Sequence, residues 1–279
     1  MKRVSMLALA LIFLCAGCED KPNSTVPSNT PEQTPAAQQE TKSTTHAVSP
    51  EQDAWVVDYS NLPERTKTYI PMLEREVKKW WPEMKEPSVF CGLIEQETCY
   101  SLTHKYCWSP TATLKTSREE GRGLGQITRA WDAKGNLRFD ALKEVRDKHR
   151  EALDGWSWKN VGDALFQIRG LIFEFKDAYA LFSYAKTETD RLAFADSAYN
   201  GGVGGVAQDR ALCKKVKGCD PNVWMGNVAD HSRKAKTKAK GYGQSFYEIN
   251  RNHVKQVVYG RKQGYEKTRR ARYQKAGLK

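Results

Sequence analysis

The chain has 279 residues, of which 39% are hydrophobic and 10% aromatic, and its net charge is +12 at neutral pH. This composition supplies enough apolar side chains for a core, which excludes an intrinsically disordered or collagen-like chain. After residue 17 no apolar run approaches the roughly 20 residues that cross a bilayer, which excludes a multi-pass membrane protein. The remaining length predicts one large domain or two small ones.

The N-terminal residues 1–17 have the pattern of an export signal. A short basic start is followed by the apolar stretch 4–14, and small residues precede Cys18. These small residues resemble the cleavage site of bacterial lipoproteins, although Cys15 stands where that site usually has leucine. The resemblance implies that Cys18 is diacylated, becomes the mature N-terminus and anchors the protein to a bacterial membrane. An ordinary secretory signal is the alternative, and in both cases we expect an exported protein facing the periplasm or cell wall.

Residues 18–53 are expected to form a flexible, disordered linker. They are rich in Pro, Ser, Thr, Gln and Ala and contain almost no large apolar side chain, so they cannot offset the entropy lost on ordering. A flexible chain of this length spans roughly 30–35 Å. The linker would therefore separate the membrane anchor from a folded domain over 54–258.

The domain over 54–258 is expected to be mainly α-helical with long irregular loops, because patterns of period 2 are scarce. Helical periodicity predicts helices over Glu64–Trp81, from Pro87 and Ser88 onward, over Val161–Phe182 and over Thr189–Asn200.

The ends of the fourth predicted helix carry recognisable signals. Thr189 is expected to be its N-cap, and Gly201-Gly202 is expected to end it. This placement predicts that Tyr199 and Asn200 lie near an exposed helix end.

Five cysteines lie in the domain. Cys99 with Cys107 and Cys213 with Cys219 would close short loops, as is typical of oxidising compartments. Cys91 is left over and is expected to be a small buried apolar residue. Zinc sites usually contain close Cys/His pairs of the C-x2-C type, and the domain has none, so we expect no metal and no cofactor.

The C-terminal part of the chain is strongly basic, and residues 259–279 are expected to form a basic tail. A surface of this kind attracts polyanions. In an exported protein these would be the cell wall and lipid head groups, so no nucleic acid is expected as a partner. A merely solvated basic face is the alternative. The residues concerned include Arg233, Lys234, Lys236, Lys238 and Lys240, followed by Arg261, Lys262, Lys267, Arg269, Arg270, Arg272, Lys275 and Lys279.

A carboxylate falls within the apolar stripe of the second predicted helix. Phe90, Leu93, Ile94 and Glu97 follow the spacing i, i+3, i+4, i+7, whereas Glu95 points to the opposite side. Burial against apolar side chains raises the pKa of a carboxyl group, as a general acid near neutral pH requires. The alternative is a glutamate at the helix end that bends out to solvent.

Three segments occur in an order that resembles a known family. They are Ile94-Glu95-Gln96-Glu97-Thr98, Ser117-Arg118-Glu119-Glu120-Gly121-Arg122-Gly123-Leu124-Gly125-Gln126, and Ala198-Tyr199-Asn200-Gly201-Gly202. Together they resemble the soluble-lytic-transglycosylase-type (SLT) domain of the lysozyme superfamily, whose segments read Glu-Ser, Ser…Gly-Leu-Met-Gln and Ala-Tyr-Asn-Ala-Gly. Thr98, Gly125 and Gly201 depart from that pattern.

Weaker matches extend the resemblance to roughly 87–258. Gln167-Ile168-Arg169-Gly170 looks like the Asn-Ile-x-x-Gly helix start of the family. Residues 248–257, which include His253-Val254, look like its closing Glu…Tyr-Val-x-x-Val helix.

The resemblance implies a lysozyme-like fold, peptidoglycan glycan strands as the partner, and a reaction with one carboxyl group. Glu97 would protonate the glycosidic oxygen of a MurNAc–GlcNAc bond. It would then take the proton from the muramyl 6-hydroxyl, which attacks the anomeric carbon and leaves a 1,6-anhydro end.

The resemblance also implies substrate-binding residues. Gln126 and Asn200 would hydrogen-bond the glycan, and Tyr199 would orient the acid or stabilise developing charge. Ser117 and Thr98 would support the site.

Two other functions stay open. One is a hydrolytic muramidase of the same fold, which normally needs a second carboxylate, for which Glu119, Glu120 and Asp132 are candidates. The other is a cell-wall-binding lipoprotein without turnover.

Overall fold

The computed structural model describes residues 54–238, 243–259 and 268–278. From Trp55 onward these residues belong to one unit. The predicted export signal over 1–17, the linker over 18–53 and the lipidation site Cys18 lie outside the described residues.

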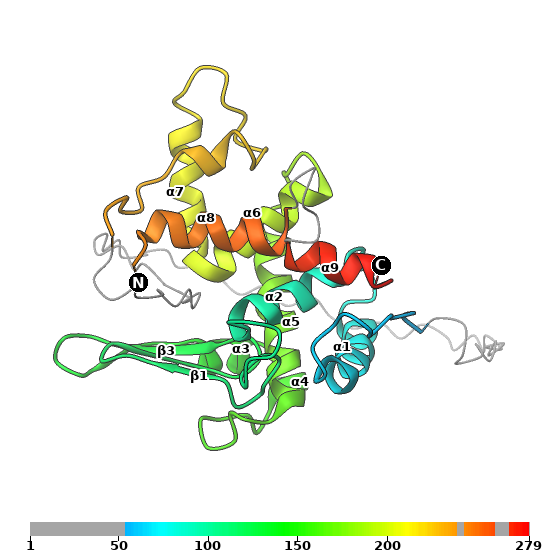
Figure 1. The fold of residues 1–279 in the computed structure, drawn as a ribbon. Coiled ribbons are helices and arrows are strands. Elements are labelled where there is room, and N and C mark those ends of the chain that lie inside the picture. The colour runs from blue at the N-terminus through cyan, green and yellow to red at the C-terminus, as the bar shows by residue number, and fades with distance from the viewer. Residues whose placement is uncertain (1–53, 239–242, 260–267, 279) are drawn as a thin grey trace, which may run out of the picture. The chain divides into compact units, whose positions relative to one another are not determined.

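The described part of the chain is mainly helical, as predicted (Figure 1). Its helices are α1 (Thr66–Trp80), α2 (Ser88–Thr98), α3 (Ala141–Lys148), α4 (Arg150–Leu153), α5 (Ala164–Ala180), α6 (Glu188–Gly201), α7 (Val203–Cys213), the 3-10 helix η1 (Val228–Asp230), α8 (Phe246–Val257) and α9 (Arg269–Lys275). Its strands are β1 (Thr113–Lys115), β2 (Glu119–Arg122), β3 (Ile127–Trp131) and β4 (Leu137–Asp140).

Helical periodicity located α1, α2, α5 and α6 to within a few residues. The predicted N-cap of α6 is wrong, because Thr187 and not Thr189 accepts a hydrogen bond, of 3.0 Å, from the backbone of Asp190. Thr187 also donates to the Asp190 carboxylate at 2.7 Å, whereas three residues after Thr189 stands Leu192, which has no side-chain acceptor. The predicted stop is confirmed: Gly202 ends the helix at a φ of 79°.

The antiparallel sheet β1-β2-β3-β4 was not predicted and replaces part of the expected irregular loops. Its strands are three to five residues long, too short for an alternating pattern to stand out. In β2 the buried Glu120 stands opposite Arg129 and is ion-paired with it at 2.8 Å. Such a strand is stabilised by paired charges, so its sequence carries no apolar signal. Helix α3 packs against β3 on one side of the sheet.

The central helix of the structure is α2, in which ten of the eleven residues are buried. Figure 1 shows α2 and α5 in the middle of the helical part, with α8 and α9 passing alongside α2. Large aromatic side chains fill the core between them, including Phe90, Phe175 and Phe194. No helix among the described residues has both the length and the apolar character needed to cross a membrane.

The C-terminal residues do not form the expected tail, as far as the structure describes them. Helix α9 packs on α2, and Tyr273 and Leu278 are fully buried. The Tyr273 hydroxyl accepts a hydrogen bond from the Trp108 indole at 2.7 Å and donates one to Glu95 at 2.8 Å. Arg272 forms an ion pair with Glu95 at 2.8 Å. The predicted domain boundary at residue 258 is therefore too early, because these contacts make α9 part of the core.

Both predicted disulfides are present. Cys99 is bonded to Cys107 and Cys213 to Cys219. Cys91 is a free, buried cysteine, as expected. The first disulfide closes the loop that directly follows α2, so it lies beside the C-terminal end of that helix.

Candidate functional site

Helix α2 directs its two C-terminal glutamates to different neighbours. Glu97 is 2% exposed and faces α8, whereas Glu95 is 2% exposed and faces α9. The helical spacing thus placed Glu97 on a buried stripe correctly. It did not indicate that Glu95 is buried as well, because α9 covers the side of the helix that the local pattern leaves free.

Glu97 is the first member of a buried chain of three ionisable side chains. Its Oε1 lies 2.9 Å from Nε2 of His253, and Nδ1 of the same imidazole lies 2.8 Å from Oδ2 of Asp196. The three side chains come from α2, α8 and α6 and have no solvent exposure. Three helices far apart in the sequence therefore meet at the imidazole of His253.

Burial and the neighbouring charges shift the pKa values of Glu97 and His253 in opposite directions. Burial raises the pKa of Glu97, and the hydrogen bond and charge of His253 counteract this in part. Burial alone would lower the pKa of His253, but Asp196 and Glu97 outweigh it and raise that pKa to about 10. The two carboxylates therefore favour the protonated, imidazolium form of His253.

A cavity of about 250 Å³ opens beside Glu97. It is lined by Gln96, Glu97, Thr98, Cys99, Tyr100, His104, Tyr106, Ala112, Thr113, Leu114 and Gln126. Three buried oxygens of these residues have no hydrogen-bond partner among the described residues, namely Gln96 Oε1, Glu97 Oε2 and Gln126 Oε1. Buried acceptors are nearly always satisfied in proteins. The cavity is therefore suited to a ligand with several N–H or O–H donors.

Gln126 is held in place by the turn between β2 and β3. Its backbone has a φ of 47°, and its amide nitrogen donates to the carbonyl of Gly123 at 2.9 Å. The amide oxygen has no hydrogen-bond partner among the described residues, and Gln126 lines the same cavity as Glu97. The structure thus brings together Gln126 and Glu97, two residues that the sequence placed in one site.

Thr98 joins the end of α2 to the loop closed by the first disulfide. Its hydroxyl donates to the carbonyl of Ile94 at 2.6 Å and accepts from the backbone N–H of Trp108 at 2.9 Å. The loop between these points supplies three aromatic side chains to the cavity, from Tyr100, His104 and Tyr106. Their rings contact one another edge to face, with centroids 6.0 Å and 5.6 Å apart.

Tyr199 approaches the site from α6 without lining the cavity of Glu97. Its hydroxyl donates to the carbonyl of Gly125 at 2.6 Å, directly before Gln126. A Cβ atom at residue 125 would lie 2.7 Å from this hydroxyl oxygen, so glycine is required for the approach. Burial, assisted by nearby carboxylates, raises the pKa of Tyr199 well above its ordinary value. Tyr199 is therefore a neutral donor that fixes the backbone of the Gln126 turn.

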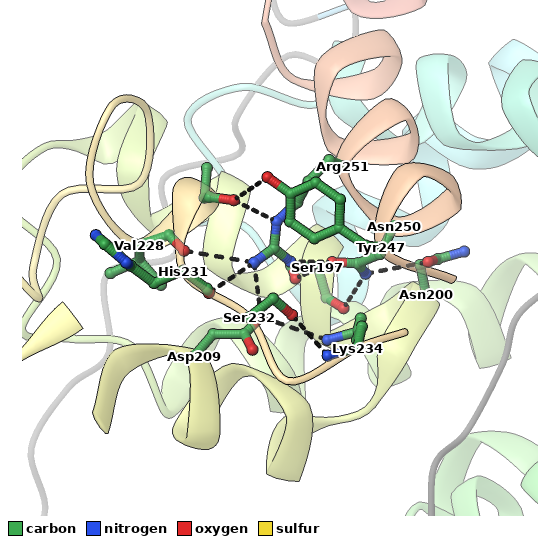
Figure 2. A network of polar contacts seen from close by, with 11 residues as sticks. Ser197, Asn200, Asp209, Val228, His231, Ser232, Lys234, Tyr247, Asn250 and Arg251 are labelled. Carbon is green, nitrogen blue, oxygen red and sulfur yellow. Dashed lines mark hydrogen bonds and ion pairs between the residues drawn. The ribbon is translucent and has the colours of Figure 1, made fainter. Parts of the chain in front are cut away.

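Asn200 is 1% exposed, so the expected exposed end of α6 is wrong at this residue. Its side-chain oxygen accepts from Asn250 at 3.0 Å, and Asn250 also bonds the carbonyl of Ser197 at 3.0 Å. Figure 2 shows these side chains pointing toward one another, with Arg251 and Asp209 extending the network through a 2.7 Å ion pair. Helix α7 begins directly after Gly202 and covers this end. Asn200 lies in the network that joins α6, α7 and α8, and it does not line the cavity of Glu97.

Ser117 is exposed in the connection between β1 and β2. It is not part of the cavity lining formed by the described residues. The structure therefore does not place Ser117 in the cavity that Glu97 lines.

The proposed second carboxylates have other contacts. Glu120 is ion-paired with Arg122 and Arg129. Asp132 is exposed in the turn before β4 and bonds Asn136. Glu119 is buried in β2. None of these three carboxylates is among the described residues that line the cavity of Glu97.

Glu174 on α5 is a carboxylate that the sequence analysis missed. It lines a neighbouring cavity of about 440 Å³ together with Tyr199. Burial and the charges of Glu144, Asp177 and Glu97 raise the pKa of Glu174 to about 8. The only local signal is a glutamate between Phe173 and Phe175 in an apolar helix.

No family model matches the chain, and no curated protein matches it. Within the described ranges, no three or more His, Cys, Asp and Glu side chains are grouped so that they could hold a metal ion.

Proposed function

We propose that this chain is a peptidoglycan lytic transglycosylase of the SLT type with Glu97 as its acid and base. The observation that carries the proposal is the position of the Glu97 carboxyl group. One oxygen is held by His253, and the other lies buried without a partner, among the described residues, beside a cavity that Gln126 also lines. A carboxyl group in this setting can exchange a proton with a ligand in the cavity.

The reaction has two steps and consumes no water. Protonated Glu97 gives its proton to the glycosidic oxygen while the bond from that oxygen to the anomeric carbon breaks. The Glu97 carboxylate then accepts the proton of the muramyl 6-hydroxyl while this oxygen bonds to the anomeric carbon. The products are a free 4-hydroxyl and a 1,6-anhydro end, and Glu97 returns to its protonated state.

The residues around the cavity suit a glycan strand. The amide oxygens of Gln96 and Gln126 can accept hydrogen bonds from hydroxyl or acetamido N–H groups. Tyr100, His104 and Tyr106 offer aromatic surface against which the apolar face of a pyranose can pack. The succession of the helix with Glu97, an antiparallel sheet and the turn with Gln126 also supports a lysozyme-like fold.

Export and lipidation at Cys18 complete the proposal. The two disulfides are compatible with an oxidising compartment outside the cytosol. A lipid anchor on a long linker would hold the domain at a bacterial membrane, within reach of the cell wall.

The test is digestion of purified sacculi followed by mass analysis of the products. Wild-type protein should release fragments with 1,6-anhydro ends, and Glu97→Gln should lower the rate by about 10²-fold or more while sparing binding. Glu83→Gln, at an exposed position outside the cavity lining, is the matched control. Equal rates for Glu97→Gln and wild type would refute the role of Glu97. Binding without release of fragments by wild type would indicate a wall-binding protein.

A hydrolytic muramidase is the second candidate, and Glu174 is the observation that favours it. Once ionised, which its raised pKa of about 8 places above neutral pH, Glu174 could activate a water molecule, as in glycosidases that use two carboxylates. The same mass analysis separates the two reactions, because hydrolysis leaves products heavier by one water. Products without anhydro ends would decide for the muramidase.

A further inference from the structure

The buried chain Glu97–His253–Asp196 has a feature that the proposed reaction does not explain. A general acid in a dry, apolar pocket needs no charged partner, since burial alone raises its pKa. Here an imidazole contacts the acid directly, and a second carboxylate contacts the imidazole from behind, with no solvent at any of the three side chains. Placing three ionisable groups in the core costs desolvation free energy, which their mutual hydrogen bonds must offset.

We propose that His253 and Asp196 are positioning residues for Glu97: they fix one oxygen of its carboxyl group and stabilise the carboxylate that forms between the two proton transfers. This inference rests on the proposed function.

The geometry assigns different roles to the two oxygens of Glu97. Nε2 of His253 donates to Oε1 at 2.9 Å, which fixes the plane of the carboxyl group. Oε2 is then the oxygen available to the ligand, and it is the one without a partner among the described residues. Nδ1 of His253 in turn donates to Asp196 at 2.8 Å, which fixes the ring itself. The proton-transferring atom is thus placed by two consecutive hydrogen bonds.

The charges assign a second role to the pair. When Glu97 has given its proton to the glycosidic oxygen, its new negative charge lies beside the imidazolium ion of His253. Asp196 keeps the imidazole protonated, so His253 holds its charge and neither gains nor loses a proton during the reaction. Other groups also act on Glu97: Arg269 of α9 favours its carboxylate. Glu174 of α5 and Tyr199 of α6 are close enough for the Glu97 charge to affect them.

The contact between an imidazole and Glu97 distinguishes this chain from the family that it resembles. His253 stands where the closing helix of the similar family has tyrosine. A tyrosine could donate one hydrogen bond to Glu97, but it could not carry a positive charge or bridge two carboxylates. The imidazole therefore brings a property that the resemblance does not imply.

The test compares pH–rate profiles of sacculus digestion for wild type and His253→Gln. Glutamine can still donate a hydrogen bond, but it removes the cation that favours the carboxylate of Glu97. The pKa of Glu97 should rise, so the alkaline limb of the pH–rate profile should shift to higher pH by about 1 to 3 units. The maximal rate should fall about 10- to 100-fold, because Glu97 becomes a weaker acid.

Two further variants distinguish a loss of the positioning role from a loss of folding. Asp196→Asn/His253→Gln replaces the charged pair by neutral groups of similar shape, leaves no unpaired charge, and should shift the profile in the same direction. Asp190→Asn is the matched control, since Asp190 is a buried aspartate of the same helix whose contacts lie at Thr187, Trp224 and Tyr259. It should leave the profile unmoved. An unchanged limb and rate in His253→Gln would overturn the positioning role.

A measurement without substrate separates this inference from the proposed function. In ¹⁵N-histidine NMR spectra of the wild type, His253 should keep both ring nitrogens protonated beyond pH 8, and in Glu97→Gln it should lose its proton at lower pH. A neutral His253 at pH 7 would overturn the inference even for an active enzyme. A wild type that leaves sacculi intact would instead overturn the proposed function and the positioning role with it, while the spectra would still establish the ion pair.

Discussion

The hydroxyl of Thr98 accepts a hydrogen bond from the backbone of Trp108, ten residues along the chain, at 2.9 Å. It simultaneously donates to the last turn of α2. One side chain thus fixes the cavity wall to the helix that carries Glu97.

Replacing Thr98 by valine should therefore lower both stability and activity. The change leaves the Trp108 N–H without its acceptor in a buried place, which costs about 1–3 kcal/mol of unfolding free energy. Thr98→Ser keeps the hydroxyl and should lie close to wild type in both respects. Urea unfolding and digestion of sacculi measure the two effects. A valine variant as active as the serine variant would contradict the role given to this hydroxyl.

A double-mutant cycle can test the contact between Tyr199 and Gly125. Gly125→Ala should disturb the Gln126 turn, because the new methyl group would meet the tyrosine hydroxyl and Leu171. Tyr199→Phe removes the hydroxyl and makes room for part of the methyl group. The double variant should therefore recover part of the activity that Gly125→Ala loses. Strictly additive losses would show that the two residues act independently.

The first disulfide should matter for activity and the second only for stability. Removing either pair by serine substitution should cost about 2 kcal/mol, since both close short loops. Loss of Cys99–Cys107 additionally frees the loop that carries Tyr100, His104 and Tyr106, so glycan binding should weaken. Binding of chito-oligosaccharides to the Glu97→Gln protein measures this. Equal binding in the two disulfide variants would rule out a contribution of the loop.

The free energy of unfolding should depend on pH through Glu174. Its pKa is raised from 4.5 to about 8 in the folded chain, so between these values the folded state binds more protons than the unfolded state. Stability therefore decreases as pH rises through this window. Glu174→Gln removes this term, and its stability relative to wild type should increase from pH 4.5 to pH 8 and then level off. Denaturant titrations at several pH values provide the measurement, and a constant difference would refute the shift.

Local sequence patterns predicted the features that depend on neighbouring residues along the chain, namely helix faces and helix ends. The apolar stripe of α2 placed Glu97 on a buried face, and the glycine pair ended α6. The sheet escaped detection because Glu120 is buried through ion pairs with its neighbours and not through an apolar alternation.

The partners of Glu97 could not be predicted in the same way. His253 lies 156 residues from Glu97, and Asp196 lies 57 residues from His253, so no short window contains the contact. Ser117 illustrates the reverse case. It belongs to the motif that also contains Gln126, yet the hairpin separates the two in space. A motif records neighbours along the chain, whereas the site is assembled from helices that meet only in the folded protein.

The contact between α9 and α2 affects when this domain can become functional. Glu95 and Tyr273 are 178 residues apart, and His253 also comes from the last part of the chain. A nascent chain that ends before these residues lacks both partners of α2, so the surroundings of Glu97 are not yet assembled. Synthesis of α8 and α9 would therefore have to precede the proposed wall-cutting activity.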